Sequence, residues 1–235
     1  MKHRFYLPQP FAAGARMTLT GDEAHHAARV VRVREGEEVE VFDGKGNAFT
    51  ATVAAIGKEI ALDLMTPVAV RRESPLAIHL AMSIIQLEKF ELVLQKATEL
   101  GAASLIPLVT DRIELRAERY RGKAERWERI VFEAVKQSGR AVLPRMEAPV
   151  EFTEVVKRPG TKVLFDADVP PTEAAASLDE VTLLIGPEGG WSDDELQLAR
   201  AHGCAFARLG PRRLRAETAG IVACTIFALR HGDLA

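Results

Sequence analysis

The chain changes its hydrophobic pattern near residue 70. In the first part, three segments alternate apolar and polar positions or carry β-branched residues, with Gly-containing turns between them: 39–44, 47–56 and 59–64. This pattern predicts antiparallel strands, and the run Asp43-Gly44-Lys45-Gly46-Asn47 predicts a hairpin between the first two. A short helix is expected over the preceding EAHHAARV, with Thr20 or Asp22 as its N-cap. We therefore expect a small β-barrel that ends near Met65, followed by a linker over 66–75.

After Pro75, buried-strand runs alternate with segments of helical spacing. The strands are expected at 76–85, 104–110, 162–168, 181–186 and 205–210, and the helices at 89–102, 125–139, 192–203 and 216–230. Gly101 and Gly139 stand where the first two helices should stop. Such alternation predicts an α/β layer with a mostly parallel sheet. The last helix is apolar nearly all round, so it is expected to be either the central helix of its domain or a subunit interface.

Composition places the chain among ordinary globular proteins. It has 235 residues, of which 47% are hydrophobic and 27% charged, enough to bury a substantial core in one domain or two. The longest apolar stretch is too short to span a bilayer and the first ten residues lack the apolar core of a signal peptide, so a cytoplasmic protein is expected. Cys204 and Cys224 have no CxxC spacing and no neighbouring His cluster, and we expect both to be core residues and no metal to be bound.

The formal net charge of -2 conceals two basic segments. Residues 112–145 contain ten Lys or Arg residues and five Glu residues. A second cluster of arginines lies within residues 208–215. Two arginine-rich segments in a slightly acidic protein indicate a localised basic surface that binds a polyanion, because the protein as a whole has no net positive charge to attract one. For the part from Glu114 to Arg129, a solvated helix face with Glu/Arg pairs explains the pattern equally well.

The segment GPEGGWSDDEL, residues 186–196, carries the most specific signal. Ser192 and Glu195 fit a capping box, which sets the start of a helix. Acidic side chains of the protein then occupy the positive end of the helix dipole, which a phosphate site would leave open, and the chain has neither GxGxxG after a strand nor GxxxxGK[ST]. This loop therefore favours a neutral or cationic ligand held along exposed backbone groups.

A second loop, LGPRRLRAETAG at 209–220, is built in a similar way between a short strand and a helix, but it carries arginines. Ligands bind at the carboxyl edge of the strands in open α/β folds, so both loops are expected side by side at that edge. The two loops would then bind a small ligand and a polyanion next to each other at this edge of the sheet. The alternative is that both segments are only tight strand-to-helix turns.

These two loops, together with KATELG, EAVKQSGR and EAHHAARVVRVREGEEVEVFDGKG, closely resemble the RsmE family of ribosomal RNA uridine-N3 methyltransferases, within the SPOUT superfamily. The resemblance runs over nearly the whole chain in the right order. It implies a PUA-like RNA-binding β-barrel over 1–68 and an α/β SPOUT methyltransferase domain with a deep trefoil knot over 75–235. It further implies a homodimer, S-adenosylmethionine (SAM) as cofactor, and a uridine of 16S rRNA near the decoding region of the 30S subunit as substrate.

The residues of this chain that match the family's motifs give the site that the resemblance implies. The cofactor loops correspond to Leu184, Ile185, Gly186, Glu188, Gly189 and Gly190 in the first and to Leu209, Gly210, Leu214, Arg215 and Thr218 in the second. The candidate catalytic residues are Arg215, Glu217 and Arg112. In the segment VTDRIEL, Asp111 and Ile113 replace the Glu and Ser usual around Arg112, so the serine hydroxyl of the family pattern is absent from this chain.

The chemistry of uridine N3 assigns roles to two of these residues. The nitrogen carries a proton that must leave, so Glu217 is the candidate base and Arg215 the candidate cation that stabilises the imide anion. Alternatively, Arg215 grips phosphate and Glu217 supports it as an ion pair. No metal is needed.

Contacts with RNA are expected from both parts of the chain. Candidates in the first part are Arg4, Arg29, Arg32 and Arg34, with Lys2 as a further contact. The resemblance adds Gln137, Ser138 and Arg140 as substrate or interface contacts, whereas the residues alone indicate a helix C-cap near Gly139. Adjacent His25 and His26 point in different directions on a helix, so an RNA-facing or structural role is preferred to a metal site.

Two other functions compete with the uridine-N3 methyltransferase. One is a SPOUT enzyme that acts on another RNA or on a ribose 2'-hydroxyl. The other is an RNA-binding assembly factor without catalysis, which ranks last because both ligand loops are intact. A nucleotide-dependent dehydrogenase or kinase is weaker still, for want of a phosphate loop.

Overall fold

The computed structural model describes residues 3–69, 73–168, 170 and 178–234. Its contacts divide the chain into two compact units. The first unit comprises Met1–Glu73 and Val135–Leu143, and the second comprises Ser74–Ala134 and Pro144–Ala235. Within the described chain, no helix is both long and apolar enough to cross a membrane.

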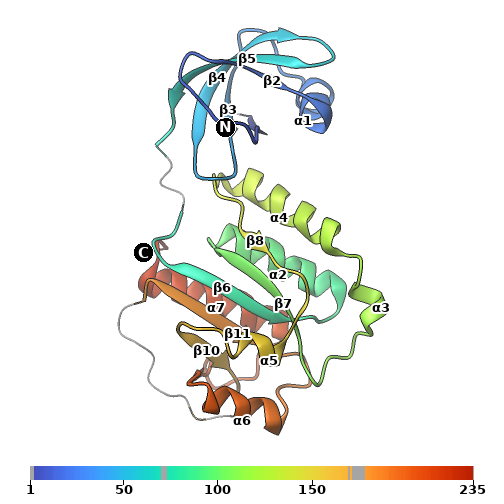
Figure 1. Ribbon diagram of the computed structural model, residues 1–235, viewed down its shortest axis with the longest axis vertical. Coiled ribbons are helices and arrows are strands. Elements are labelled where there is room, and N and C mark those ends of the chain that lie inside the picture. The colour runs from blue at the N-terminus through green and yellow to red at the C-terminus, as the bar shows by residue number, and fades with distance from the viewer. Residues whose placement is uncertain (1–2, 70–72, 169, 171–177, 235) are drawn as a thin grey trace. The chain divides into compact units, whose positions relative to one another are not determined.

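A curled five-stranded sheet forms the first unit (Figure 1). Its strands are β1 (Arg4–Tyr6), β2 (Arg16–Leu19), β3 (Glu38–Phe42), β4 (Ala48–Ile56) and β5 (Ile60–Pro67). They pair in the order β1-β3-β4-β5-β2, antiparallel except for β1 with β3. The sheet packs around alternate apolar side chains, among them Phe5, Val39 and Leu62, all fully buried. This alternation is what the sequence predicted for β3, β4 and β5.

The predicted hairpin joins β3 to β4. The carboxylate of Asp43 accepts hydrogen bonds from the backbone N–H groups of Lys45 and Asn47, at 2.7 and 3.0 Å, and from the amide of Asn47. Burial alone would raise the pKa of Asp43, but these hydrogen bonds bring it below its usual value. Gly44 and Gly46 both have positive φ, which explains the glycines at these positions.

The expected first helix is present but changes its winding. α1 (Gly21–His25) follows Thr20, whose side chain makes no capping bond, and continues into a π-helical segment, η1 (His26–Val31). The chain leaves η1 through Arg32 at φ 59° and ψ 49°, the left-handed region. Ala24 and Ala27 turn towards the sheet and are buried.

The second unit is built on a parallel sheet. Its strands are β6 (Ala77–Ser83), β7 (Ser104–Val109), β8 (Arg145–Met146), β9 (Val150–Glu151), β10 (Lys162–Phe165), β11 (Glu180–Ile185) and β12 (Ala205–Ala207). The order is β12-β10-β11-β6-β7-β8, with β9 also on β7, and every pairing is parallel. The mostly parallel α/β sheet predicted from the sequence is confirmed.

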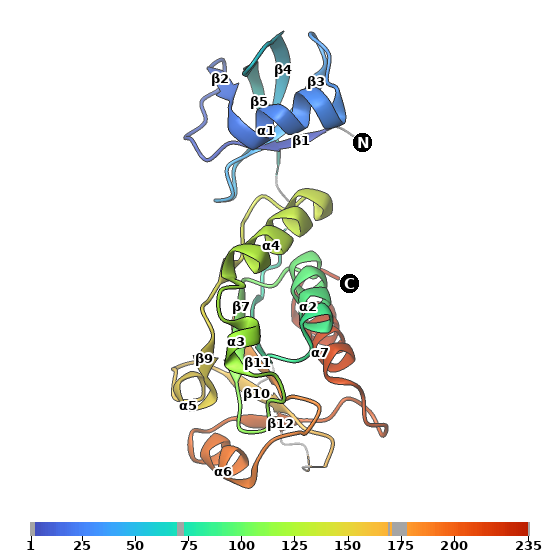
Figure 2. The ribbon, with the colours of Figure 1, turned by 90° about the vertical axis from the view of Figure 1, so that its right-hand side faces the viewer.

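Helices cover both faces of this sheet, as Figures 1 and 2 show. α2 (Leu87–Glu99) and α7 (Ala216–His231) lie on one face, whereas α5 (Phe152–Val155) and α6 (Asp193–Ala201) lie on the other. The described residues also form α3 (Ala117–Tyr120) and α4 (Ala124–Ser138). On the α2 and α7 side, Gly220 allows a close approach, because an added Cβ would lie 3.3 Å from Val93.

The core contains residues of each predicted strand and helix. Cys204 and Cys224 are buried, as expected, with relative exposures of 7% and 0%. Gly101 and Gly139 adopt positive φ where α2 and α4 end. The short elements β1, β2, β8, β9, α3 and α5 were not predicted. Part of the linker expected over 66–75 falls outside the described residues, and β5 already extends to Pro67.

Candidate active site

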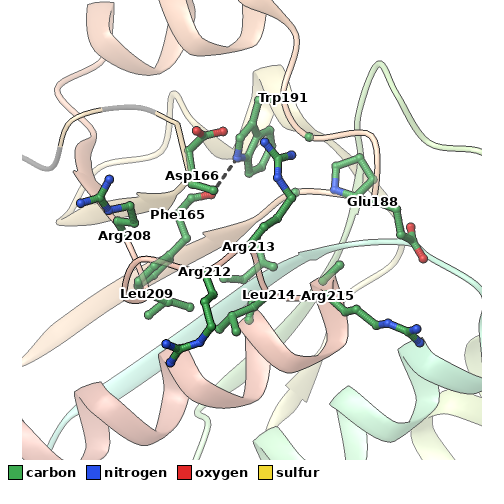
Figure 3. A pocket seen from close by; sticks show the side chains of 17 residues that line it. Phe165, Asp166, Glu188, Trp191, Arg208, Leu209, Arg212, Arg213, Leu214 and Arg215 are labelled. Atoms are coloured by element: carbon green, nitrogen blue, oxygen red, sulfur yellow. Dashed lines mark hydrogen bonds between the residues drawn. The ribbon is translucent and has the colours of Figure 1, made fainter.

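The two glycine-containing loops meet at the carboxyl edge of the parallel sheet. The first loop, residues 186–192, connects β11 to α6, and the second loop, residues 208–215, connects β12 to α7. Together they line a pocket of about 330 Å³ (Figure 3). The juxtaposition predicted from the sequence is therefore present, and the two segments are more than separate turns.

A third segment, at the carboxyl end of β10, also lines the pocket. Phe165, Asp166 and Ala167 line it, and the indole Nε1 of Trp191 donates a hydrogen bond to the carbonyl oxygen of Phe165 at 3.0 Å (Figure 3). Trp191 is almost fully buried and also packs on Phe152, with ring centroids 5.1 Å apart. The indole thus ties the first loop to the segment after the neighbouring strand.

Gly186 is required by the closeness of this indole. A Cβ on Gly186 would lie 2.9 Å from Cε2 of Trp191, closer than real Cβ contacts. Gly190, in contrast, has φ +69° and no atom near its missing Cβ, so it is needed for its backbone conformation. The two glycines therefore serve different purposes in one turn.

The predicted capping box opens α6. Ser192 Oγ accepts a hydrogen bond from the backbone N–H of Glu195 at 3.2 Å, and Glu195 accepts one from the backbone of Ser192 at 2.8 Å. Glu195 also accepts from the backbone N–H of Asp111 at 3.1 Å. Burial raises the pKa of Glu195, against the effect of these hydrogen bonds. The protein's own carboxylates occupy this helix N-terminus, which supports the exclusion of a phosphate site.

The loop after β7 holds the first loop in place through hydrogen bonds outside the pocket. Arg112 Nη1 donates a hydrogen bond to the carbonyl oxygen of Gly189 at 3.0 Å, and the hydroxyl of Ser192 donates one to Asp111. An added Cβ on Gly189 would lie 3.2 Å from Cβ of Arg112. Asp111, noted in the sequence only as a departure from the family pattern, therefore has a structural partner.

Most of the predicted cofactor residues line the pocket, but four do not. Those that line it are Ile185, Gly186, Glu188, Gly190, Leu209, Leu214 and Arg215. Leu184 points into the core on the opposite face of the sheet, which follows from the alternation of side chains along β11. Gly189 contacts Arg112, Gly210 supplies a positive φ, and Thr218 is exposed in the first turn of α7.

The candidate catalytic pair lies at the start of α7. Arg215 is its N-cap residue and lines the pocket, and Glu217 is in its first turn. No ion pair joins these two described residues, so the alternative in which Glu217 supports Arg215 as an ion pair is not seen in this structure. Glu217 is not among the residues that line the pocket, and its Oε2 is buried without a hydrogen-bond partner in the described part of the chain. A buried acceptor of this kind is unusual and calls for a donor.

Arginines dominate the charge around the pocket. Arg208, Arg212, Arg213 and Arg215 all line it, and in Figure 3 Arg212 and Arg215 extend to opposite sides of the second loop. Arg213 is paired with Asp168, and both side chains are largely exposed. On the acidic side, Glu188 lies 3.6 Å from Nζ of Lys89, which stands in the first turn of α2.

The chemistry of the lining fits SAM. Leu209, Leu214 and Ile185 provide apolar walls, and the glycines expose backbone amides and carbonyls for an adenosine. The carboxylate of Glu188 can balance a cationic sulfonium, and the arginines can receive a carboxylate group.

Comparison with known proteins decides the family. A family profile described as an RNA methyltransferase domain matches residues 72–228, and one described as an RNA methyltransferase PUA domain matches residues 19–62. A ribosomal RNA small subunit methyltransferase E from Synechocystis is 36% identical over 233 residues, covering 95% of this chain and 76% of the relative. The chain belongs to this methyltransferase family.

Solved structures agree over the whole chain. A protein from Legionella pneumophila in complex with the cofactor SAM has a TM-score of 0.91 and 34% identity, and a ribosomal RNA small subunit methyltransferase E from Neisseria gonorrhoeae bound to SAM has a TM-score of 0.89 and 30% identity. Both comparisons cover 100% of each chain.

The residues expected to contact RNA fall into two groups. Arg29, Arg32, Arg34 and Gln137 are exposed. Arg4 and Arg140 are not, because their side chains are only 6% and 4% exposed and form ion pairs at 2.7 Å with Glu40 and Glu73. A phosphate would have to displace the carboxylate of Glu40 or Glu73 to reach them. Lys2 lies outside the described residues, His25 is exposed, and His26 packs edge-on against Phe5.

Sequence reasoning did not identify several residues of the site. Trp191 was quoted within its motif without a role, and Phe165, Asp166 and Lys89 were not considered. A carbonyl that receives an indole N–H leaves no signal in the sequence, and Phe165 reads only as a buried strand residue. The partial exception is Trp191, because a tryptophan directly after a Gly-Gly turn is a candidate packing anchor.

Proposed function

We propose that this protein transfers the methyl group of SAM to N3 of one uridine in 16S rRNA, near the decoding region of the 30S subunit. The observation that carries the proposal is the pocket in which two cofactor-type loops meet beside four arginines, in a chain of this methyltransferase family. When bound, SAM supplies an electrophilic methyl group. Everything else in the reaction is binding, orientation and the handling of one proton.

The first and second loops are proposed to hold the cofactor. Gly186 and Gly190 present backbone groups, Leu209 and Leu214 cover the apolar part, and Glu188 balances positive charge. The backbones of Leu184, Gly189 and Gly210 shape these loops, and Thr218 is a proposed contact from α7. Because the walls come from three strand ends, the reacting groups are held on a rigid sheet edge, which favours catalysis by orientation.

Glu217 is proposed to accept the proton of uridine N3. Its Oε2 is buried and has no hydrogen-bond partner among the described residues, and Glu217 adjoins the pocket-lining Ala216, so the proposal requires that substrate binding expose this carboxylate to the N3–H group. Arg215, at the N-cap of α7, is proposed to stabilise the negative charge that remains on the base. Arg112 is proposed to act on the cofactor loop through Gly189.

The exposed Arg29, Arg32, Arg34 and Gln137 are proposed to bind RNA, with the first 68 residues as a PUA-like barrel and residues 75–235 as the methyltransferase domain. These contacts would position the substrate and would not read its sequence.

A homodimer is proposed from the surface of α7. Ile221, Val222 and Ile226 are only partly buried, and Leu229 is 53% exposed, so the apolar face of α7 is not fully covered by its own chain. Leu92, on the adjacent α2, is 41% exposed. Leu229→Glu should therefore shift the mass measured by sedimentation equilibrium towards the monomer.

A deep trefoil knot is proposed for the methyltransferase domain. The strand order β12-β10-β11-β6-β7, with both loops at one pocket, is consistent with a chain that passes through its own loop. Such knots are rare. Pulling the denatured chain from both ends should give a contour length shorter than that of an unknotted chain of 235 residues.

The experiment that tests the reaction uses 30S subunits that lack the modification. After incubation with the protein and SAM, nucleosides of the digested 16S rRNA are identified by mass spectrometry. We expect 3-methyluridine at one site, strongly reduced with Arg215→Ala or Glu217→Gln and retained with the control Arg230→Ala, at the far end of α7. A methylated ribose or another base would replace the proposed substrate by the SPOUT alternative, and the absence of SAM binding would favour the assembly factor.

A further inference from the structure

An ion pair joins the first turn of α2 to the cofactor pocket. Nζ of Lys89 lies 3.6 Å from Oε1 of Glu188, a residue of the first loop that lines the pocket. The side chains of Lys89 and Glu188 are 31% and 36% exposed, so solvent and ligands can reach both. A cation of α2 therefore stands beside a carboxylate that can also balance the charge of a cationic ligand.

The packing of α2 on α7 brings Lys89 to this end of the sheet. α2 follows β6 and α7 follows β12, so both helices begin at the carboxyl edge of the parallel sheet, and they lie side by side in Figure 2. Gly220 permits their close approach, because an added Cβ would lie 3.3 Å from Val93. Lys89 precedes Val93 by about one helical turn. The pocket-lining Ala216 likewise precedes Gly220 by about one turn, so the helix contact also sets the position of Lys89 near the pocket.

The pair is loose compared with a second ion pair on α2. At 3.6 Å, Lys89 and Glu188 attract each other by charge but are too far apart for a hydrogen bond. Lys96, in contrast, donates to both carboxylate oxygens of Glu99, at 2.9 and 3.0 Å. Among the described residues, neither Lys89 nor Glu188 takes part in another ion pair or side-chain hydrogen bond. Partly exposed pairs of this kind contribute little to stability, so a competing charge can separate them at small cost.

Glu188 is the better placed of two acidic residues that line the pocket to receive such a competing cation. The other is Asp166, whose carboxylate accepts a hydrogen bond from the backbone N–H of Asp168 at 2.7 Å. In Figure 3 the side chains of Glu188 and Arg215 extend towards the same side of the view, whereas Asp166 lies on the other side, beside Trp191. Glu188 therefore lies on the side of the pocket where the proposed catalytic cation extends.

The charge in the pocket changes during the proposed reaction. SAM carries a positive charge on sulfur. Methyl transfer breaks the sulfur–carbon bond and leaves its electron pair on sulfur, so the product, S-adenosylhomocysteine (SAH), is neutral there. N3 of the uridine gains the methyl group and loses its proton, which Glu217 is proposed to accept. Lys89 thus has a competitor for Glu188 before the transfer and none after it.

We propose that the charge of the bound cofactor determines, through Glu188, whether Lys89 binds a phosphate of the RNA substrate. With a cationic cofactor, Glu188 is shared and Lys89 is released to a phosphate. With SAH, Glu188 pairs with Lys89 again, and the RNA is bound more weakly. The exchange favours binding of the substrate before the transfer and release of the product after it. This inference deepens the proposed function and rests on it for the identity of the RNA.

Co-sedimentation with unmodified 30S subunits tests this coupling. The protein is saturated either with SAH or with sinefungin, a SAM analogue that has a cationic amine at the sulfonium position and no methyl group to transfer. The unaltered protein should bind 30S about fivefold more tightly with sinefungin than with SAH. In Lys89→Met the two affinities should agree within about twofold, and the salt slope with sinefungin should fall by about one. Lys89→Arg keeps the charge and should keep the difference between the two ligands.

Glu188→Gln should give the opposite result. Lys89 then has no carboxylate to return to, so 30S should be bound with SAH about as tightly as the unaltered protein binds it with sinefungin. A purely structural role for the pair predicts instead that Lys89→Met and Glu188→Gln weaken 30S binding alike with both ligands. Lys96→Met is the matched control, since it removes a paired lysine from the last turn of the same helix, and it should keep the fivefold difference of the unaltered protein.

Calorimetry without RNA tests the competition for Glu188 by itself. Lys89→Met leaves Glu188 to the ligand alone, so SAM should bind about threefold more tightly than to the unaltered protein, whereas the affinity for SAH should not change. Equal changes for SAM and SAH, or weaker binding of SAM alone, would contradict the exchange.

Nucleoside analysis of the same 30S samples, repeated with SAM, separates this inference from the proposed function. If the unaltered protein forms 3-methyluridine but binds 30S equally well with sinefungin and SAH, the exchange at Glu188 is wrong and the proposed reaction stands. If the unaltered protein neither binds nor methylates 30S, both proposals fall.

Discussion

Arg112 donates a hydrogen bond from Nη1 to the carbonyl oxygen of Gly189 at 3.0 Å and so connects the loop after β7 to the first cofactor loop. Arg112→Ala should weaken SAM binding by about fivefold, because an exposed hydrogen bond from a charged donor contributes about 1 kcal/mol. Isothermal titration calorimetry with SAM measures this loss. Arg116→Ala removes a nearby exposed arginine and should leave the affinity unchanged. Equal losses in both variants would mean that general charge, and not the bond to Gly189, matters.

Gly186→Ala should disturb both folding and the pocket. Its Cβ would lie 2.9 Å from the indole of Trp191, which is buried and bonded to Phe165. We expect a loss of about 1–3 kcal/mol in the free energy of unfolding, as for overpacked cores, and a red-shifted tryptophan emission. In Gly57→Ala the nearest atom is 3.6 Å away, so this control should be close to neutral. A Gly186→Ala protein as stable as the control would show that Trp191 is not tightly held.

Glu195 should make stability depend on pH in a defined direction. Burial raises the pKa of this carboxyl in the folded protein, so the folded state holds the proton more tightly than the unfolded state does. Its contribution to stability is therefore largest below the unfolded pKa and declines as the pH rises through the folded pKa. The free energy of unfolding of the unaltered protein, minus that of Glu195→Gln, should fall with pH above about 4.5. A difference that rises over this window would contradict the assignment.

Neither cysteine should react quickly with thiol reagents. Burial raises the pKa of Cys224 to about 12 and also raises that of Cys204. At pH 8 the reactive thiolate is therefore scarce, and both side chains are shielded from reagent. Ellman's reagent should detect almost no thiol in the native protein and two per chain in guanidinium chloride. A fast-reacting thiol in the native protein would indicate local opening around the cysteine concerned.

Local rules predicted the elements that carry the site. The Ser192 and Glu195 capping box is an interaction over three residues, so the sequence alone set the start of α6. Apolar runs likewise predicted the strands that end at the pocket. Short elements such as β8 and β9, with two residues each, have too few positions for a periodic pattern, and they form because β7 offers them a pairing edge.

Contacts between residues far apart in the sequence determine which of the arginines predicted to bind RNA are buried and which are exposed. Arg4 and Arg140 resembled the other arginines in composition, yet Glu40 and Glu73 bury them in ion pairs over 36 and 67 residues. Arg29 and Arg34 have no such partners among the residues that the structure describes. The difference depends on which carboxylates the fold brings near, and a single sequence does not contain that information in any local form.

Residues 135–143 belong to the first unit, although residues 74–134, which precede them, belong to the second. This arrangement affects the order in which the first unit can fold during synthesis. Arg4 bonds to carbonyl oxygens at the end of α4, and Glu73 to the side chain of Arg140. As the chain leaves the ribosome, Arg4 can pair with Glu40 early, but its hydrogen bonds to residues 135–140 and the ion pair of Glu73 with Arg140 form only after residues 74–143 have been synthesised. A fragment that ends at Glu73 would remain in that unfinished state permanently.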